Sequence, residues 1–188
     1  MPPFAPTVLT TEHDLSDFDC GKPNLNDWLK RRARNNQALG FTAVVVLHDA
    51  GRVFGYYGLA PTSVEPRDLP RRVRTGQPPT PVPCLLLGQF AIDLRFQGLG
   101  YGGKLALHAL ERAVASADIA GGRALLILAI DEEACQYWRR WSFLPLPNDP
   151  MRMVRSLPEI RASLRYRLCR SVDDRQERLE IFGRHTDG

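Results

Sequence analysis

The sequence has little of what membrane, secreted and metal-binding proteins need. Among its 188 residues no apolar run approaches the roughly 18 residues that a membrane span requires. Residues 1–14 lack the basic and apolar segments of a secretory signal. The four cysteines stand far apart and form no Cys-x-x-Cys pair, and the four histidines show no ligand spacing. These absences predict a cytoplasmic protein with reduced thiols, no membrane contact and no metal site.

For one cysteine and one histidine, Cys135 and His108, the sequence allows a prediction of their surroundings. Cys135 is expected near a cleft, but no histidine stands close to it in sequence to activate the thiol. A buried, unreactive thiol is therefore favoured over a nucleophile. His108 falls within a predicted helix, and we expect it at the surface.

Lysine is scarce as well, because 22 of the 25 basic residues are arginine. The planar guanidinium binds phosphate groups in a bidentate manner, so this composition suits phosphate recognition, although a GC-rich genome would give the same bias. Two clusters, within 30–34 and 67–74, are either solvated surface or contacts to the phosphate backbone of a nucleic acid. The cluster residues that matter most are Lys30, Arg31, Arg34, Arg71, Arg72 and Arg74.

Hydrophobic periodicity predicts an α/β protein with a mixed central sheet flanked by helices. Leu25, Trp28 and Leu29 recur at helical spacing, and the apolar run at 84–93 indicates a central strand buried on both faces. The proline-rich stretch 64–83 is expected to be a loop. The predicted elements are helices at 24–37, from the glycine-rich stretch to 120 and at 132–141, strands at 41–48, 52–60, 84–93 and 123–130, and a strand pair within 143–157.

Residues 97–104, Q-G-L-G-Y-G-G-K, satisfy three glycine patterns at once. Each pattern cradles a diphosphate, because glycine lets backbone amides approach closely and a helix N-terminus adds partial positive charge. A P-loop requires Ser or Thr after its lysine, but Leu105 follows Lys104. A dinucleotide fingerprint requires its first glycine at the strand end, but residues 93–97 intervene. The third pattern, Q-x-x-G-x-G, is that of the pyrophosphate loop of acyl-CoA-dependent acetyltransferases.

Three blocks of sequence together resemble one known family. The strand and loop at 85–105 resemble those of the Gcn5-related N-acetyltransferase (GNAT) family, and in particular those of its toxin branch. Residues 18–40 and 131–153 are similar to the toxin branch of that family, found in bacterial toxin–antitoxin pairs. The resemblance covers about residues 10–160 in the family's order. It implies a GNAT domain over 1–160, followed at 161–188 by a charged C-terminal tail or marginal helix.

The resemblance implies acetyl-CoA as the co-substrate. In the family the pantetheine arm pairs with the strand that is here Phe90, Ala91 and Ile92, where a backbone N–H also polarises the thioester carbonyl. The pyrophosphate lies on the glycine loop that follows. The loop residues are Gln97, Gly98, Leu99, Gly100, Tyr101, Gly102, Gly103 and Lys104.

For the toxin branch, the resemblance implies the α-amino group of an aminoacyl-tRNA as the acceptor, and its acetylation blocks translation. An α-amine has a pKa of about 7.7–8.0, so a useful fraction is neutral and no strong general base is demanded. The arginine clusters would contact the tRNA backbone. The branch also implies a ribbon-helix-helix antitoxin that covers the active cleft, and it leaves a homodimer open.

The sequence departs from the family at the proton donor. The family has a Phe-Tyr pair whose tyrosine protonates the departing CoA thiolate, whereas this chain has Tyr137 and Trp138. An indole N–H donates hydrogen bonds but is no practical acid. Three outcomes stay open: Tyr137 takes the role through a local shift, water or another group takes it, or the protein binds CoA with little turnover. Two other functions stay open too, an ordinary GNAT enzyme acting on a small-molecule or protein amine and a catalytically silent acyl-CoA-binding or tRNA-binding module.

Overall fold

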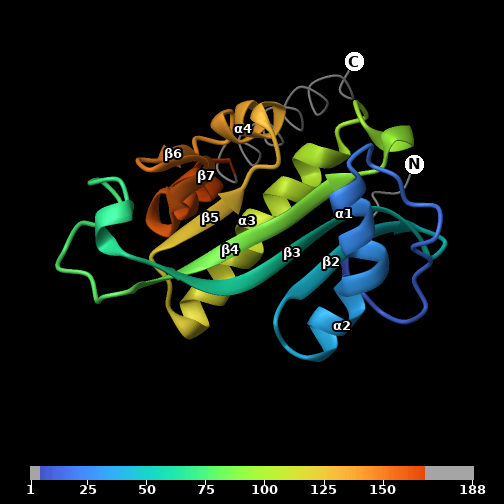
Figure 1. Ribbon diagram of the computed structural model, residues 1–188, viewed down its shortest axis with the longest axis horizontal. Coiled ribbons are helices and arrows are strands. Elements are labelled where there is room, and N and C mark those ends of the chain that lie inside the picture. The colour runs from blue at the N-terminus through green and yellow to red at the C-terminus, as the bar shows by residue number, and fades with distance from the viewer. Residues whose placement is uncertain (1–4, 168–188) are drawn as a thin grey trace, which may run out of the picture.

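The computed structural model describes residues 5–167, which form a seven-stranded mixed sheet with helices on both faces (Figure 1). The strand order is β1-β2-β3-β4-β5-β7-β6, and every neighbouring pair is antiparallel except β4 and β5. The strands are β1 (Thr7–Val8), β2 (Ala43–Asp49), β3 (Arg52–Val64), β4 (Val82–Ile92), β5 (Ala124–Leu128), β6 (Leu144–Leu146) and β7 (Asp149–Ser156). The helical segments are α1 (Pro23–Asp27), the π-helical η1 (Trp28–Arg32), α2 (Ala33–Ala38), the 3-10 turns η2 (Pro66–Asp68) and η3 (Leu94–Phe96), α3 (Tyr101–Ala120), α4 (Glu132–Arg139) and a last helix over 157–167.

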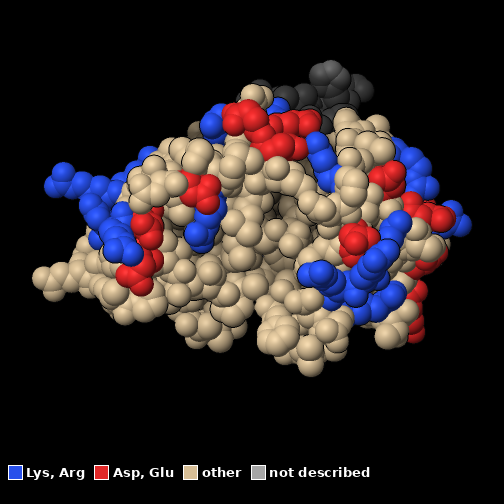
Figure 2. All heavy atoms as spheres, in the orientation of Figure 1, with Lys and Arg blue, Asp and Glu red and all other residues tan. Residues whose placement is uncertain are grey.

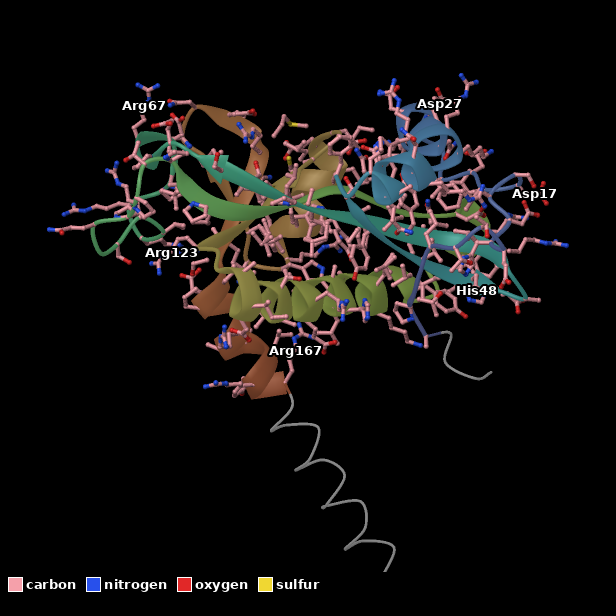
Figure 3. The ribbon with its side chains drawn as sticks, turned by 90° about the horizontal axis from the view of Figure 1, so that it is seen from below. Asp17, Asp27, His48, Arg67, Arg123 and Arg167 are labelled. Carbon is pink, nitrogen blue, oxygen red and sulfur yellow. The ribbon has the colours of Figure 1, made fainter. Side chains whose placement is uncertain are left out.

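The two faces of the sheet have different covers, as the view from below shows (Figure 3). On one face, α3 buries five residues that contact apolar side chains of β4 and β5, and each leucine-sized side chain stabilises the fold by roughly 1.5–3 kcal/mol. On the other face, α1 to α2 packs Leu29 and Ala33 on β2 and β3. The segment between β3 and β4 adds Leu69 and Val73 over β5 and β7. This second face therefore has two separate covers.

The parallel pair at the centre of the sheet separates after three residues. Leu85, Leu86 and Leu87 pair with β5, but β4 continues to Ile92 without it. At the same point β4 has a bulge, because the partners of Gly58 and Leu59 are Gln89 and Leu87, which leaves Gly88 as the extra residue. Beyond Leu87, the β5-facing edge of β4 has no strand partner within residues 5–167. The sheet thus opens into a V between β4 and β5.

Most of the predicted elements are confirmed, with three differences. The predicted helix at 24–37 is three consecutive segments with a π turn in the middle, for which helical spacing carries no signal. The predicted loop at 64–83 is shorter, because β3 and β4 pair out to Val64 and Val82, which are both buried despite the prolines nearby. The residues from 161 continue a helix that begins at 157, and the rest of the predicted tail, 168–188, lies outside the described residues. Within 5–167 no helix combines the length and apolar character needed to cross a membrane.

Candidate active site

A cavity of about 450 Å³ fills the V between β4 and β5. Its walls come from the residues before α1, the end of β4, the glycine loop and the start of α4. Figure 2 shows the molecule hollowed at its centre in this region. Of the residues predicted from the sequence, those that line the cavity are Phe90, Ala91, Ile92, Gln97, Gly98, Gly102, Tyr137 and Trp138.

The glycine loop has the backbone shape of an anion site. Gly98 and Gly100 have φ values of 73° and 83°, in the left-handed region that favours glycine. Gly100 is the N-cap of α3, whose twenty residues begin at Tyr101. The first amides of a helix have no intrahelical acceptor, so they are available to an anion beside the helix N-terminus.

Nothing within residues 5–167 requires glycine at position 103. Its φ is not positive, and a Cβ added there would meet no described atom within 4 Å. Gly102 differs, since a Cβ there would lie 3.6 Å from the hydroxyl oxygen of Tyr137. Glycine inside a helix costs roughly 0.5–1 kcal/mol relative to alanine. The space beside Gly103 is therefore open to an external group.

Asp93 fixes the glycine loop to the segment that precedes α1. Its carboxylate is buried and accepts from the Arg95 side chain at 2.8 Å, from the Arg95 amide and from the Asp19 amide. Burial alone would raise the pKa of Asp93, but the hydrogen bonds from Arg95 and Asp19 outweigh it and lower the pKa to about 2. Sequence analysis missed this residue, because its partner Asp19 lies 74 positions away.

Asp93→Asn is expected to lower the free energy of unfolding at pH 7 by about 3 kcal/mol, since it removes a buried carboxylate that accepts hydrogen bonds from Arg95 and Asp19. The pKa of Asp93 is lowered on folding, so its contribution is complete above the ordinary value of 3.8 and is lost as the pH falls towards about 2. Urea unfolding of both proteins at pH 7 and pH 2.5 should show the difference shrinking at the lower pH. Asp27→Asn, at an exposed pair with Arg31, is the control and should change stability by less than about 0.5 kcal/mol. A difference that does not depend on pH would contradict this role of Asp93.

The side chain of Gln97 is already engaged within the protein. Its Nε2 donates to the Ile92 carbonyl at 2.8 Å and to the Cys20 carbonyl at 3.4 Å. Gln97 therefore holds the end of β4, the glycine loop and the segment before α1 together. Lys104 is exposed, with its Nζ 5.6 Å from the centroid of the Tyr101 ring.

Tyr137 and Trp138 both reach the cavity from a regular α4, without a distorted turn. Their rings meet edge to face at 5.0 Å. Trp138 is buried in the core, edge-on to Phe90 at 5.0 Å and near Phe143. The Tyr137 hydroxyl is also buried, yet no described group lies in hydrogen-bonding geometry with it. Burial raises the pKa of Tyr137, and the nearby Trp141 and Arg140 offset this only in part.

An ion pair connects the two sides of the cavity. Lys22 Nζ, just before α1, lies 2.7 Å from the Asp131 carboxylate, which is also the N-cap of α4 and accepts from the Ala134 amide. Glu133 lies 4.0 Å from the same Nζ. The hydrogen bond and charge of Asp131 raise the pKa of Lys22, while Lys22 and the Ala134 amide lower that of Asp131. All three residues that meet at this ion pair line the cavity.

Lys22→Met is expected to release a ligand bound in the cavity about two- to fivefold faster, a modest effect because the ion pair is partly exposed and screened by solvent. Stopped-flow displacement of acetyl-CoA from the full chain would measure the rate. The wild-type rate should approach the variant rate at 1 M salt, where screening is strong. The prediction assumes that the Lys22–Asp131 ion pair helps to keep the ligand in the cavity. Equal release rates for the two proteins at low salt would contradict this role.

The two basic clusters lie on either side of the hollow in Figure 2. Lys30, Arg31 and Arg34 are exposed on η1 and α2. The other three, Arg71, Arg72 and Arg74, are exposed in the segment after η2, the end of the molecule where Figure 3 labels Arg67. Several of these side chains also have partners in the protein: Asp27 for Arg31, the His13 carbonyl for Arg34, Glu159 for Arg72 and the Pro66 carbonyl for Arg74.

Two side predictions have different outcomes. Cys135 is buried, as expected for an unreactive thiol, and burial raises its pKa. The surface position predicted for His108 is wrong. Its ring is half-buried, and its Nδ1 lies 3.0 Å from the Tyr57 hydroxyl, because α3 turns this residue towards β3. Burial lowers the pKa of His108.

Known proteins match the chain along most of its length. A tRNA-acetylating toxin of Mycobacterium tuberculosis is 37% identical over 158 residues, which are 84% of this chain and 95% of the relative. The chain belongs to this family of tRNA-acetylating toxins. The toxin AtaT complexed with acetyl-methionyl-tRNAfMet has the same fold, with a TM-score of 0.77, 25% identity, and coverage of 84% of this chain and 97% of AtaT.

A second structure extends the comparison. A mutant of AtaT bound to the C-terminus of the antitoxin AtaR and to acetyl-CoA has a TM-score of 0.71 and 26% identity, and the match covers 83% of this chain and 94% of that toxin. The GNAT fold and the toxin-branch membership inferred from the sequence are thereby confirmed. No family model matches the chain.

Proposed function

We propose that this chain transfers the acetyl group of acetyl-CoA to the α-amine of an aminoacyl-tRNA and so stops translation. The observation that carries this proposal is the cavity in the β4–β5 opening, with the glycine loop at one end, in a member of the tRNA-acetylating toxin family. A protein that acts on charged tRNA works in the cytoplasm. AtaT, which shares the fold, has been captured with an acetylated aminoacyl-tRNA.

In this proposal the cavity binds acetyl-CoA along β4. The amides of residues 98–103 at the N-terminus of α3 receive the pyrophosphate, and the exposed Lys104 side chain adds positive charge. The unpaired edge at Phe90 and Ala91 can bond the amide groups of the pantetheine arm, as an added strand would. A backbone N–H of that edge polarises the thioester carbonyl.

The α-amine attacks the thioester carbon, the carbon–sulfur bond breaks, and the sulfur takes a proton while the amine gives one up to solvent. We assign the proton on sulfur to Tyr137. Tyr137 lines the cavity, and its buried hydroxyl has no hydrogen-bond acceptor within 5–167 and retains its proton because burial raises its pKa. Cys20 is a poorer donor, since its Sγ already bonds Asn26 Oδ1 at 3.1 Å. Trp138 shapes the cavity wall against Phe90.

The tRNA lies across the face that Figure 2 shows, with its backbone phosphates at the two basic clusters. The cluster of Lys30, Arg31 and Arg34 and that of Arg71, Arg72 and Arg74 stand on opposite sides of the hollow. Such contacts position the RNA without reading its sequence and weaken steeply with salt.

An antitoxin is the second partner that we propose, because the related AtaT is bound by AtaR. The basic surface around the cavity would suit an acidic segment of that partner. Its ribbon-helix-helix type and a homodimer of the toxin rest on the family resemblance alone. Size-exclusion chromatography with light scattering would test the dimer directly.

The proposal is tested by incubating the protein with labelled acetyl-CoA and a pool of charged tRNAs, with uncharged tRNA, free amino acids and protein lysines as controls. Label on charged tRNA alone is the expected result. Label on free amines or on protein would instead favour an ordinary acetyltransferase. Binding of acetyl-CoA without label on any acceptor would favour the silent module.

A further inference from the structure

Arg152, on β7, lies on the sheet face opposite α3. Among residues 5–167 it is the one residue with a buried side-chain nitrogen that has no hydrogen-bond partner. Its Nε is buried and has no hydrogen-bond acceptor within 5–167. The ion pairs among those residues do not include it either. A buried, unpaired Nε is costly. The two terminal nitrogens of the guanidinium are neither buried nor paired among these residues, so they are open to an external acceptor.

Arg152 faces away from α3, towards the face that carries the basic clusters. It is the cross-strand partner of Leu128 on β5, so the two side chains lie on the same face. Leu126, two residues earlier, is buried with Leu69 and Val73 in the cluster opposite α3. Leu128 itself is not covered and is 46% exposed.

Leu128 and Ile130 connect this arginine to the cavity. Ile130 is 41% exposed and lines the cavity. The path from Ile130 to Arg152 is short, at about 7 Å along the chain to Leu128 at the end of β5 and about 5 Å across to β7. An apolar surface and a guanidinium thus lie beside each other at the cavity mouth.

We infer that Arg152, Leu128 and Ile130 form the seat for the single-stranded 3′ end of the tRNA. The phosphodiester next to the terminal nucleotide accepts from the Arg152 guanidinium, and a nucleobase lies on Leu128 and Ile130. This assignment rests on the proposed function. With the 3′ end held at this position, the aminoacyl group that it carries reaches the cavity. Charge complementarity selects the occupant, because arginine clusters flank this seat on both sides.

The seat has a role different from that of the two clusters. The cluster side chains are exposed, and several already have protein partners, so each contributes a screened and replaceable contact. Arg152 is partly buried and has no partner among the described residues, so a phosphate there forms a charge-assisted hydrogen bond without displacing a protein group. Substitution of Arg152 should therefore weaken aminoacyl-tRNA binding more than substitution of any one cluster arginine.

The test compares two acceptors with the same α-amine, an aminoacyl-tRNA and the methyl ester of its amino acid, for Arg152→Met and Leu128→Ser. Arg152→Met is expected to raise KM for the aminoacyl-tRNA about tenfold or more, and Leu128→Ser about threefold. For both variants, kcat/KM on the methyl ester and KM for acetyl-CoA should stay within twofold of wild type. Arg52→Met, an exposed strand arginine at another end of the sheet, is the matched control and should behave as wild type.

Two results would overturn the inference. One is an equal KM for aminoacyl-tRNA in Arg152→Met and Arg52→Met. The other is a loss of kcat/KM for the methyl ester as large as the loss for aminoacyl-tRNA, which would indicate a structural defect in the variant. Failure of the proposed function is distinguishable, because the wild-type protein would then acetylate the methyl ester or no acceptor, and not the charged tRNA.

Discussion

Gly100→Val is expected to raise the Kd for acetyl-CoA by about 100-fold or more. A β-branched residue is strongly disfavoured at a φ of 83°, so the N-cap of α3 must rearrange and turn its amides away from the pyrophosphate. Losing even two charge-assisted hydrogen bonds would account for this factor. Isothermal titration calorimetry on the full chain measures it.

Gly76→Val is the matched control for this prediction. Gly76 has a φ of 79°, and a Cβ there would meet no described atom within 4 Å, so the backbone strain is similar but lies far from the cavity. Its Kd for acetyl-CoA should match that of wild type. If both glycine variants bind alike, the loop is not the pyrophosphate site.

Gly103→Val separates a steric effect from backbone strain. Since this position has neither a positive φ nor a neighbour within 4 Å, valine should leave the thermal midpoint nearly unchanged. It should still weaken acetyl-CoA about tenfold or more, because it occupies the space through which the ligand approaches the amides. Unaltered binding would mean that glycine at 103 has another cause.

Tyr137→Phe is expected to lower kcat by about 100- to 1000-fold, as typical for loss of a general acid. The Kd for acetyl-CoA should change less than threefold, since the ring and its packing on Phe90 are kept. Rapid-quench measurement of acetyl transfer at saturating substrates isolates the chemical step.

Trp138→Phe is the companion variant. It removes the indole N–H but keeps an aromatic ring against Phe90, so kcat should fall less than about tenfold, with the main loss in stability because Trp138 is buried. A large loss of kcat in Trp138→Phe, with none in Tyr137→Phe, would reverse the two roles. No loss in either variant would indicate that water protonates the sulfur.

The sequence determines the local features of this protein better than its long-range contacts. The buried strand β4, the glycine loop and α3 follow one another directly, and each has a strong signature, so their order and the loop were predicted correctly. The resemblance of three blocks then indicated the fold, which the related toxins confirm.

What the sequence left unseen depends on tertiary packing. Asp93 and Asp19 meet only because β4 ends beside the segment before α1, and Lys22 meets Asp131 across the cavity. The bulge at Gly88 was not predicted, although glycine inside a strand often marks one, and it accompanies the opening between β4 and β5. Arg152 was indistinguishable from other arginines until its burial was known.

The most direct test of the central claim is the chemical identity of the acetylated product. Charged tRNA is incubated with the protein and labelled acetyl-CoA, the aminoacyl ester is cleaved with mild base, and the released fraction is analysed by mass spectrometry. We predict that the label leaves the RNA as an N-acetyl amino acid. Label that stays with the RNA, on a nucleoside, would contradict acetylation of the α-amine.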